Sequence, residues 1–324
     1  MPLLVIVALI LVAELLLQLI APGLHDPTFF NVQGTFTDRP DLREDPKLFW
    51  IPLDRFAGVT AQLEQTPPAD CIVFFGGSIV YGWPRPDNGS YPEFLQERLA
   101  ADPQRAGLKV VNYAFPGYSS HQSSLLAEEI LSDHDVKLVA VSHATNDARR
   151  MSFTDREAAK INGRIAKRLL YRFNKSKIFT IYRRFILGFV KSEKPIWDET
   201  GAGGKPRVSP TEFRENMLRY INAVSAQNAR LVMISHVDNN PAFRAGQDNY
   251  FRVMEELAQN YDNVAYIDLR PEFQKLFDTP EPDYMNAEDP SLRLLVDHCH
   301  LTKQGNRLVA EILYRELNKL GWLD

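Results

Sequence analysis

Cysteine, net charge and internal repetition are all scarce in this sequence. Its 324 residues contain two cysteines, which excludes a small scaffold held together by disulfide bonds. The formal net charge is only −4 at pH 7, so the chain lacks the basic footprint of nucleic-acid-binding proteins, and we expect no nucleic-acid partner. No repeat or low-complexity tract occurs. Hydrophobic residues make up 45% of the chain, which is enough for a sizeable core.

Long hydrophobic runs are absent except at the start, from Leu3 to Ile20. These 18 residues include 14 Leu, Ile or Val, and only Glu14 and Gln18 are polar. On insertion scales the apolar side chains outweigh one carboxylate, so the run predicts a transmembrane helix. A retained anchor over residues 1–22 is favoured over a cleaved signal peptide, because the run is long for a signal core and no basic side chain precedes it. A buried helix of a soluble domain is the least favoured alternative.

The chain after this run divides into a linker and a main domain. Residues 23–68 are rich in Pro, Asp and Thr without periodicity, which predicts a stalk. From residue 69, short apolar segments alternate with amphipathic ones. The predicted strands are 71–75, 109–115, 137–144, 229–235 and 264–269, and the predicted helices are 91–100, 123–133, 211–227, 250–260 and 302–320. This alternation predicts an α/β fold with a five-stranded parallel sheet covered by helices on both faces.

A basic insertion interrupts the alternation at about residues 148–209. Its segment 160–194 holds eleven Lys or Arg and one acid, a balance of +10. Apolar residues recur every three to four positions, which predicts two basic amphipathic helices. Basic faces that are merely solvated are the favoured interpretation, and contact with an anionic lipid surface or polymer is the alternative.

Four polar blocks follow strands or precede the last helix of the predicted domain. Ser78 follows the first strand, Gly117 the second and Asn146 the third, while Asp297 and His300 precede the final helix. Because the carboxyl ends of parallel strands meet at one edge of the sheet, we expect these residues to come together there.

The residue types match the needs of acyl transfer. The Ser78 hydroxyl needs a base to become a nucleophile, and the His300 imidazole can supply it. Asp297, three residues earlier, can fix the tautomer of that imidazole and stabilise its protonated form. The oxyanion that forms on the substrate needs hydrogen-bond donors, for which the backbone N–H groups of Ser78 and Gly117 and the Asn146 amide are candidates.

These blocks resemble those of the SGNH hydrolases, the GDSL-like esterase/lipase superfamily. Ser78, Gly117, Asn146 and His300 occur in that family's order, and "TND" (145–147) and "DxxHLTxxG" (297–305) are the most specific matches. The resemblance covers residues 69–324 apart from the insertion. It implies a flavodoxin-like three-layer α/β/α sandwich, no metal or organic cofactor, and hydrolysis or transfer of acyl groups.

The chain departs from the family pattern at two positions. The usual Gly-Asp-Ser is Gly76-Gly77-Ser78, and the residue two before Asn146 is Ala144 instead of glycine. Both changes leave the candidate triad and donors in place and put the fit of the substrate in doubt. The lipase motif G-x-S-x-G is absent because Val80 stands two residues after the serine, which argues against an α/β-hydrolase.

A metal site is a rival interpretation of "DHCH" (297–300). Its side chains are all possible ligands, but neighbours along an extended segment point to opposite sides, so a further ligand from His143, His236 or Asp238 would be required. The triad explains Asp297 and His300 without a metal and is favoured. We also expect Cys71 and Cys299 not to pair, because the length of a strand separates them.

The sequence thus predicts a single-pass, membrane-anchored serine esterase whose main domain lies outside the cytoplasm, or a secreted one if the first segment is cleaved. Its substrate would be a small-molecule or glycan ester. The alternatives are an O-acyltransferase acting on cell-surface polysaccharide and a non-catalytic binding protein on the same scaffold. The loop 277–291 before the histidine is a candidate lid, with an ordinary surface loop as the alternative.

Overall fold

The computed structural model describes residues 2–21, 41–84, 89–151, 153–165, 176–182, 204–277 and 293–324. The chain forms two compact units. One comprises Met1–Leu53 and Met151–Gly204, and the other comprises Asp54–Arg150 and Lys205–Asp324. Residues 278–291 of the candidate lid lie outside the described residues, as does most of the basic segment 160–194.

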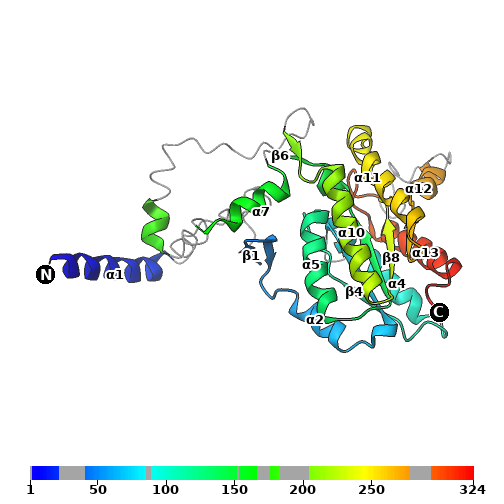
Figure 1. Ribbon diagram of the computed structural model, residues 1–324, viewed down its shortest axis with the longest axis horizontal. Coiled ribbons are helices and arrows are strands. Elements are labelled where there is room, and N and C mark those ends of the chain that lie inside the picture. Colours follow the sequence, from blue (N-terminus) through cyan, green and yellow to red (C-terminus); the bar gives the residue numbers. More distant parts are fainter. Residues whose placement is uncertain are drawn as a thin grey trace. The chain divides into compact units, whose positions relative to one another are not determined.

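The second unit is built on the predicted parallel sheet. Its strands are β3 (Cys71–Gly76), β4 (Lys109–Asn112), β5 (Leu138–Ser142), β8 (Arg230–Ile234) and β9 (Val264–Ile267). They lie in the order β4-β3-β5-β8-β9, and every neighbouring pair is parallel (Figure 1). The chain moves from β3 outward to β4 and then crosses to β5 on the other side, so the loops after β3 and β5 flank the switch point where ligands bind in such sheets.

Helices cover both faces of this sheet, as predicted. On one face α4 (Tyr91–Ala100) packs against α13 (Lys303–Lys319), and on the other α5 (Ser120–Asp133) packs against α10 (Pro210–Ala226) (Figure 1). Successive side chains of β3 serve opposite faces: Phe74 joins the core beneath α4 and α13, whereas the Phe75 ring lies 5.8 Å from the Tyr220 ring of α10. All six residues of β3 are therefore buried.

Shorter elements complete the second unit. They are α2 (Ala57–Glu64), the 3₁₀ helix η1 (Pro68–Asp70), α3 (Ser78–Tyr81), α6 (Thr145–Ala148), α11 (Pro241–Asn260) and α12 (Arg270–Phe277). β6 (Arg150–Met151) and β7 (Lys205–Pro206) lie where the insertion leaves and rejoins this unit along the chain.

Several boundaries differ from the predictions because polar residues ended the apolar pattern early. Helix α11 begins at Pro241 instead of 250, and α5 begins at Ser120 instead of 123. Strand β4 ends at Asn112 instead of 115, where the Asn112 side chain donates to the Val80 carbonyl and accepts from the Ala114 N–H.

Part of the predicted stalk 23–68 is regular structure. β1 (Leu42–Asp45) and β2 (Phe49–Pro52) form an antiparallel hairpin in the first unit, and α2 belongs to the second. The Tyr113 hydroxyl donates to Thr60 of α2 at 3.0 Å, and the Phe56 ring lies 5.7 Å from the Tyr113 ring. The second unit therefore begins before the predicted boundary at residue 69.

The first unit contains α1 (Pro2–Ile20), the helix formed by the apolar run. Its one carboxylate is satisfied, because Glu14 accepts hydrogen bonds at 2.8 Å from the Ser176 hydroxyl and the Lys177 N–H. Within the described residues the protein has no helix that is both long and apolar enough to cross a membrane, so the predicted transmembrane span is not supported.

The described part of the insertion contains one capped helix, α7 (Asp155–Gly163). Thr154 and Glu157 form a capping box at its start. The helix ends at Gly163, within the apolar repeat that begins at Ile161 and predicted the first basic helix, and residues 166–175 lie outside the described part. Residues 177–182 are helical, within the second predicted basic helix.

Candidate active site

Two glycines bring Ser78 to the carboxyl end of β3. A Cβ atom on Gly76 would lie 2.1 Å from the Val80 Cγ2 atom, and one on Gly77 would lie 2.7 Å from the Asn146 Nδ2 atom. Neither position has room for a side chain, so the turn can form only with glycine or with displacement of its neighbours. Ser78 then starts helix α3 directly beside the Asn146 amide.

Ser78, His300 and Asp297 form one hydrogen-bonded chain. The His300 Nε2 atom lies 2.8 Å from the Ser78 Oγ atom, and the His300 Nδ1 atom lies 2.7 Å from Asp297 Oδ2. The other Asp297 oxygen accepts from the backbone N–H groups of His300 and Cys299, at 2.8 and 2.9 Å. The structure therefore brings together the three side chains predicted to form the triad.

The Asp297 carboxylate is held in its charged form. Partial burial acts to raise its pKa, but the hydrogen bonds from the His300 ring and from the Cys299 and His300 N–H groups outweigh that effect, and the pKa lies well below its usual range. A carboxylate at this place favours the tautomer that carries a proton on Nδ1, which leaves the Nε2 lone pair facing the serine.

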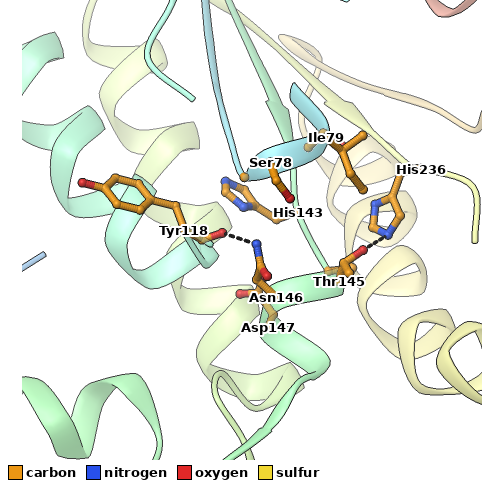
Figure 2. A pocket seen from close by; sticks show the side chains of 11 residues that line it. Ser78, Ile79, Tyr118, His143, Thr145, Asn146, Asp147 and His236 are labelled. Carbon is orange, nitrogen blue, oxygen red and sulfur yellow. Dashed lines mark hydrogen bonds between the residues drawn. The ribbon is translucent and has the colours of Figure 1, made fainter. Parts of the chain in front are cut away.

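A small cleft opens beside Ser78, with about 250 Å³ of empty space that includes open solvent. Figure 2 shows Ser78 between the loops that follow β5 and β8. The cleft is lined by Gly77, Ser78, Ile79, Tyr118, Ser142, His143, Ala144, Thr145, Asn146, Asp147 and His236. These residues lie at the carboxyl ends of β3 and β5 or in the segments that follow β3, β4, β5 and β8, at the edge where parallel strands end.

Asn146 is one of the three hydrogen-bond donors predicted for the oxyanion, and its side chain lines the cleft. One proton of its Nδ2 group goes to the Tyr118 carbonyl at 3.0 Å (Figure 2), so the second proton remains for a ligand. Gly117 has a φ angle of 77°, which favours glycine. It adjoins Tyr118 but is not itself among the residues that line the cleft.

Two buried histidines of the cleft, His143 and His236, had no role in the predicted triad and were named only as possible ligands of the rival metal site. Burial lowers the pKa of His143 to about 3 and that of His236 to about 4, so both are neutral at pH 7. The His236 Nε2 atom is hydrogen-bonded to the Thr145 hydroxyl (Figure 2). Their position directly after β5 and β8 was a usable signal, because all strand ends of this sheet meet at one edge.

His298 forms hydrogen bonds with Asp238 and Asn239 instead of with Ser78. Its Nδ1 atom lies 3.2 Å from Asp238 Oδ2, and its carbonyl accepts from the Asn239 N–H at 2.8 Å. Asp238 also accepts from Gln247 at 2.9 Å. These bonds fasten the loop that carries His300 to the loop after β8.

The rival metal interpretation gains one observation. Ligand atoms of Asp297, Cys299 and His300 lie within 4.8 Å of one another. However, the His300 Nδ1 atom and the Asp297 carboxylate are hydrogen-bonded to each other. Burial also raises the pKa of the Cys299 thiol, which disfavours the thiolate form that binds a metal. Cys71 and Cys299 are both buried free thiols.

Comparisons with known proteins identify the second unit. A model of the GDSL-like lipase/acylhydrolase family matches residues 74–308. Among solved structures, a catalytic mutant of an acetylxylan esterase from Geobacillus stearothermophilus is 16% identical, with a TM-score of 0.50 over 78% of this chain and 96% of its own.

A second solved structure is an alpha/beta hydrolase enzyme from the metagenome of Lake Arreo, Spain. It is also 16% identical, with a TM-score of 0.50 over 79% of this chain and 96% of its own. At this identity the two likenesses concern the fold alone. No curated protein matches the chain.

Proposed function

Because the chain belongs to the GDSL-like lipase/acylhydrolase family, whose SGNH pattern its sequence resembles, we propose that it is an esterase in which Ser78, His300 and Asp297 act as a catalytic triad. The observation that carries this proposal is the unbroken hydrogen-bonded chain from the Ser78 hydroxyl through His300 to Asp297 at the edge of a cleft. The roles of the three residues follow from their atoms.

In the proposed reaction the Ser78 oxygen attacks the ester carbonyl while His300 Nε2 takes the hydroxyl proton. The negative charge on the carbonyl oxygen is stabilised by the second Nδ2 proton of Asn146 and by the N–H groups of Ser78 and Gly117. The C–O bond to the alcohol breaks as His300 returns the proton to the leaving oxygen. Water then attacks the acyl-enzyme by the same steps, which releases the acid and restores the serine.

Labelling with a fluorophosphonate probe tests the nucleophile. We expect the full-length protein to be labelled at Ser78 and to hydrolyse p-nitrophenyl acetate, and we expect Ser78→Ala to lose both properties. A wild-type protein that stays unlabelled and inactive would instead support a non-catalytic binding protein on this scaffold.

Transfer of the acyl group to a sugar hydroxyl is the principal alternative outcome. It shares the acyl-enzyme and differs only in the group that attacks it. Product analysis with an acetylated donor and a candidate polysaccharide separates the two reactions: an acylated polysaccharide identifies a transferase, whereas free acetate alone identifies a hydrolase. With an acetylated oligosaccharide as the donor, the same experiment tests whether glycan esters are substrates.

We further propose that α1 attaches the protein to a membrane, with the esterase unit outside the cytoplasm. The support is that Glu14 and Gln18 are the only polar residues of α1 and that most of its large apolar side chains from Leu4 to Ile20 are exposed. Basic residues of 160–194 are candidates for contact with anionic lipid or polymer. Fractionation tests the attachment: the full chain should stay with membranes in high salt and the chain lacking residues 1–21 should not.

A further inference from the structure

We propose that Arg207 is a positioning residue for the oxyanion hole. It stands three residues after Gly204, close to where the chain re-enters the second unit, and the proposed triad does not require it. The inference rests on the proposed function, because it assigns Gly117 and Asn146 as oxyanion donors and asks what holds them in place.

Arg207 is buried, with 1% of its surface exposed, and its guanidinium holds the turn that contains Gly117. Its Nη1 group donates to the Gly117 carbonyl at 2.8 Å, and its Nη2 group donates to Gln122 Oε1 at 2.7 Å. The same Gln122 oxygen accepts from the Ser119 N–H at 3.2 Å. The planar guanidinium group of Arg207 therefore holds Gly117, at the beginning of the turn, directly. It holds Ser119, at the end of the turn, through the Gln122 side chain.

The same turn connects the two proposed donors. Arg207 fixes the Gly117 carbonyl, and the Asn146 amide fixes the next carbonyl, that of Tyr118. These two carbonyls belong to the peptide groups that follow Gly117 and Tyr118, so holding both restricts the dihedral angles of Tyr118. The Gly117 N–H belongs to the preceding peptide group, which is joined to the first held group through the φ and ψ angles of Gly117. Because that φ angle is 77°, in a region that glycine adopts readily, the direction of the N–H depends on how firmly the Gly117 carbonyl is held.

The backbone beside Arg207 is bonded to the segment that carries Asn146. The Arg207 N–H donates to the Arg149 carbonyl at 2.8 Å, and the Val208 N–H donates to the Asp147 carbonyl at 3.1 Å. The Tyr250 hydroxyl in turn donates to the Val208 carbonyl at 2.7 Å. Residues 207–208 thus hold one donor through main-chain bonds and the other through the Arg207 side chain.

A second contact strengthens the link between the two loops. The Asp147 carboxylate accepts from the Ser120 N–H at 2.9 Å and from the Ser120 hydroxyl, and Asn216 donates to that hydroxyl at 3.0 Å. The loops of Gly117 and Asn146 are therefore joined by buried polar groups on both sides. The buried guanidinium costs free energy of desolvation, which an apolar residue of similar length would not.

The test compares Arg207→Met and Arg207→Lys in the full-length protein, with p-nitrophenyl acetate as substrate. We expect Arg207→Met to lower kcat about 10- to 100-fold with KM changed less than about twofold, because a donor shifted by roughly 1 Å loses much of its effect on the transition state. Lysine supplies a cation without the fork, so we expect an intermediate kcat. In Arg207→Ala, millimolar guanidinium should restore part of the lost kcat.

Gln227→Met serves as the control. Gln227 bonds to the carbonyls of Leu131 and His134 and to the Val136 N–H, at the opposite edge of the sheet. We expect it to lower the melting temperature and leave kcat unchanged. The proposal is overturned if Arg207→Met and Arg207→Lys both keep the wild-type kcat. It is also overturned if Gln227→Met, at the same loss of stability as Arg207→Met, loses as much kcat as that variant. Should Arg207→Met not fold, the Arg207→Lys kcat decides. Retained activity in Ser78→Ala would instead overturn the proposed function.

Discussion

The Nε2 atom of His300 lies 2.8 Å from the Oγ atom of Ser78, although 222 positions separate the two residues in the sequence. The loop that carries His300 is held at the histidine and two residues before it. The Val296 N–H donates to the His300 carbonyl at 2.8 Å, and the Asn239 N–H donates to the His298 carbonyl at 2.8 Å. The histidine therefore reaches the serine from a fastened loop.

His300 and His298 provide a matched pair for testing the base. We expect His300→Ala to lower kcat about 10³-fold or more, because the serine then has no proton acceptor. His298 contacts Asp238 and its removal should lower kcat less than about tenfold. Steady-state hydrolysis of p-nitrophenyl acetate measures both. Wild-type turnover in His300→Ala together with an inactive His298→Ala would reverse the assignment.

Gly77 tests the space beside Asn146. A Cβ atom at this position would lie 2.7 Å from the Asn146 Nδ2 atom, so Gly77→Ala must move the amide or the serine turn. We expect a loss of about tenfold or more in kcat. Gly58→Ala is the control, since a Cβ on Gly58 meets no atom within 4 Å. If kcat is the same in both variants, the amide at Asn146 does not act on the transition state.

Ala144 has a φ angle of 134°, a region that L-residues rarely adopt, and it lines the cleft. Ala144→Gly should relieve about 1 to 3 kcal/mol of strain and lose about 0.4 to 1 kcal/mol through the more flexible unfolded chain, so stability should rise. Ala140→Gly, in the middle of β5, should only destabilise. Urea unfolding of both variants gives the comparison, and a less stable Ala144→Gly protein would rule out the strain.

The buried histidines predict a loss of stability in weak acid. Their pKa values in the folded protein are about 3 for His143 and about 4 for His236, lowered mainly by burial, against about 6.5 in an unfolded chain. Between pH 6.5 and about 4 the unfolded chain binds protons that the folded protein does not. The free energy of unfolding should therefore decrease as the pH falls, by up to about 1.4 kcal/mol per pH unit for each histidine.

His236→Gln removes one of these two groups. We expect the free energy of unfolding of this variant to depend less steeply on pH than that of the wild type over the same interval. Urea unfolding at pH 7, 6 and 5 measures the slopes. Equal slopes in the two proteins would mean that folding does not lower the pKa of His236.

The α/β class and the central strands followed from local patterns. A fully buried strand such as β3 has no polar position, so "CIVFF" was visible from composition alone. The first turns of α11 were missed because Pro241 and the polar residues among 244–249 leave no apolar repeat in the sequence of this stretch. The hairpin β1–β2 was missed because residues 23–68 show no clear periodicity and were interpreted as a stalk.

The sequence by itself determined the chemistry available to this protein: a serine after a Gly-Gly turn, the TND segment, and a histidine three residues after an aspartate. These patterns are local, because a turn, a hydrophobic strand or an i to i+3 spacing depends only on neighbouring residues.

The sequence predicted that Ser78, Asp297 and His300 meet, but the tertiary structure alone decided the distances between them and the further residues around them. The order of the strands sets the distance between Ser78 and His300, and packing across the sheet edge turns His236 toward the cleft and Arg207 toward Gly117. Such contacts join segments that are far apart in the chain, and the sequence of one segment does not specify which other segment it will contact. Their geometry depends on how the whole core packs, which is why it became visible only in three dimensions.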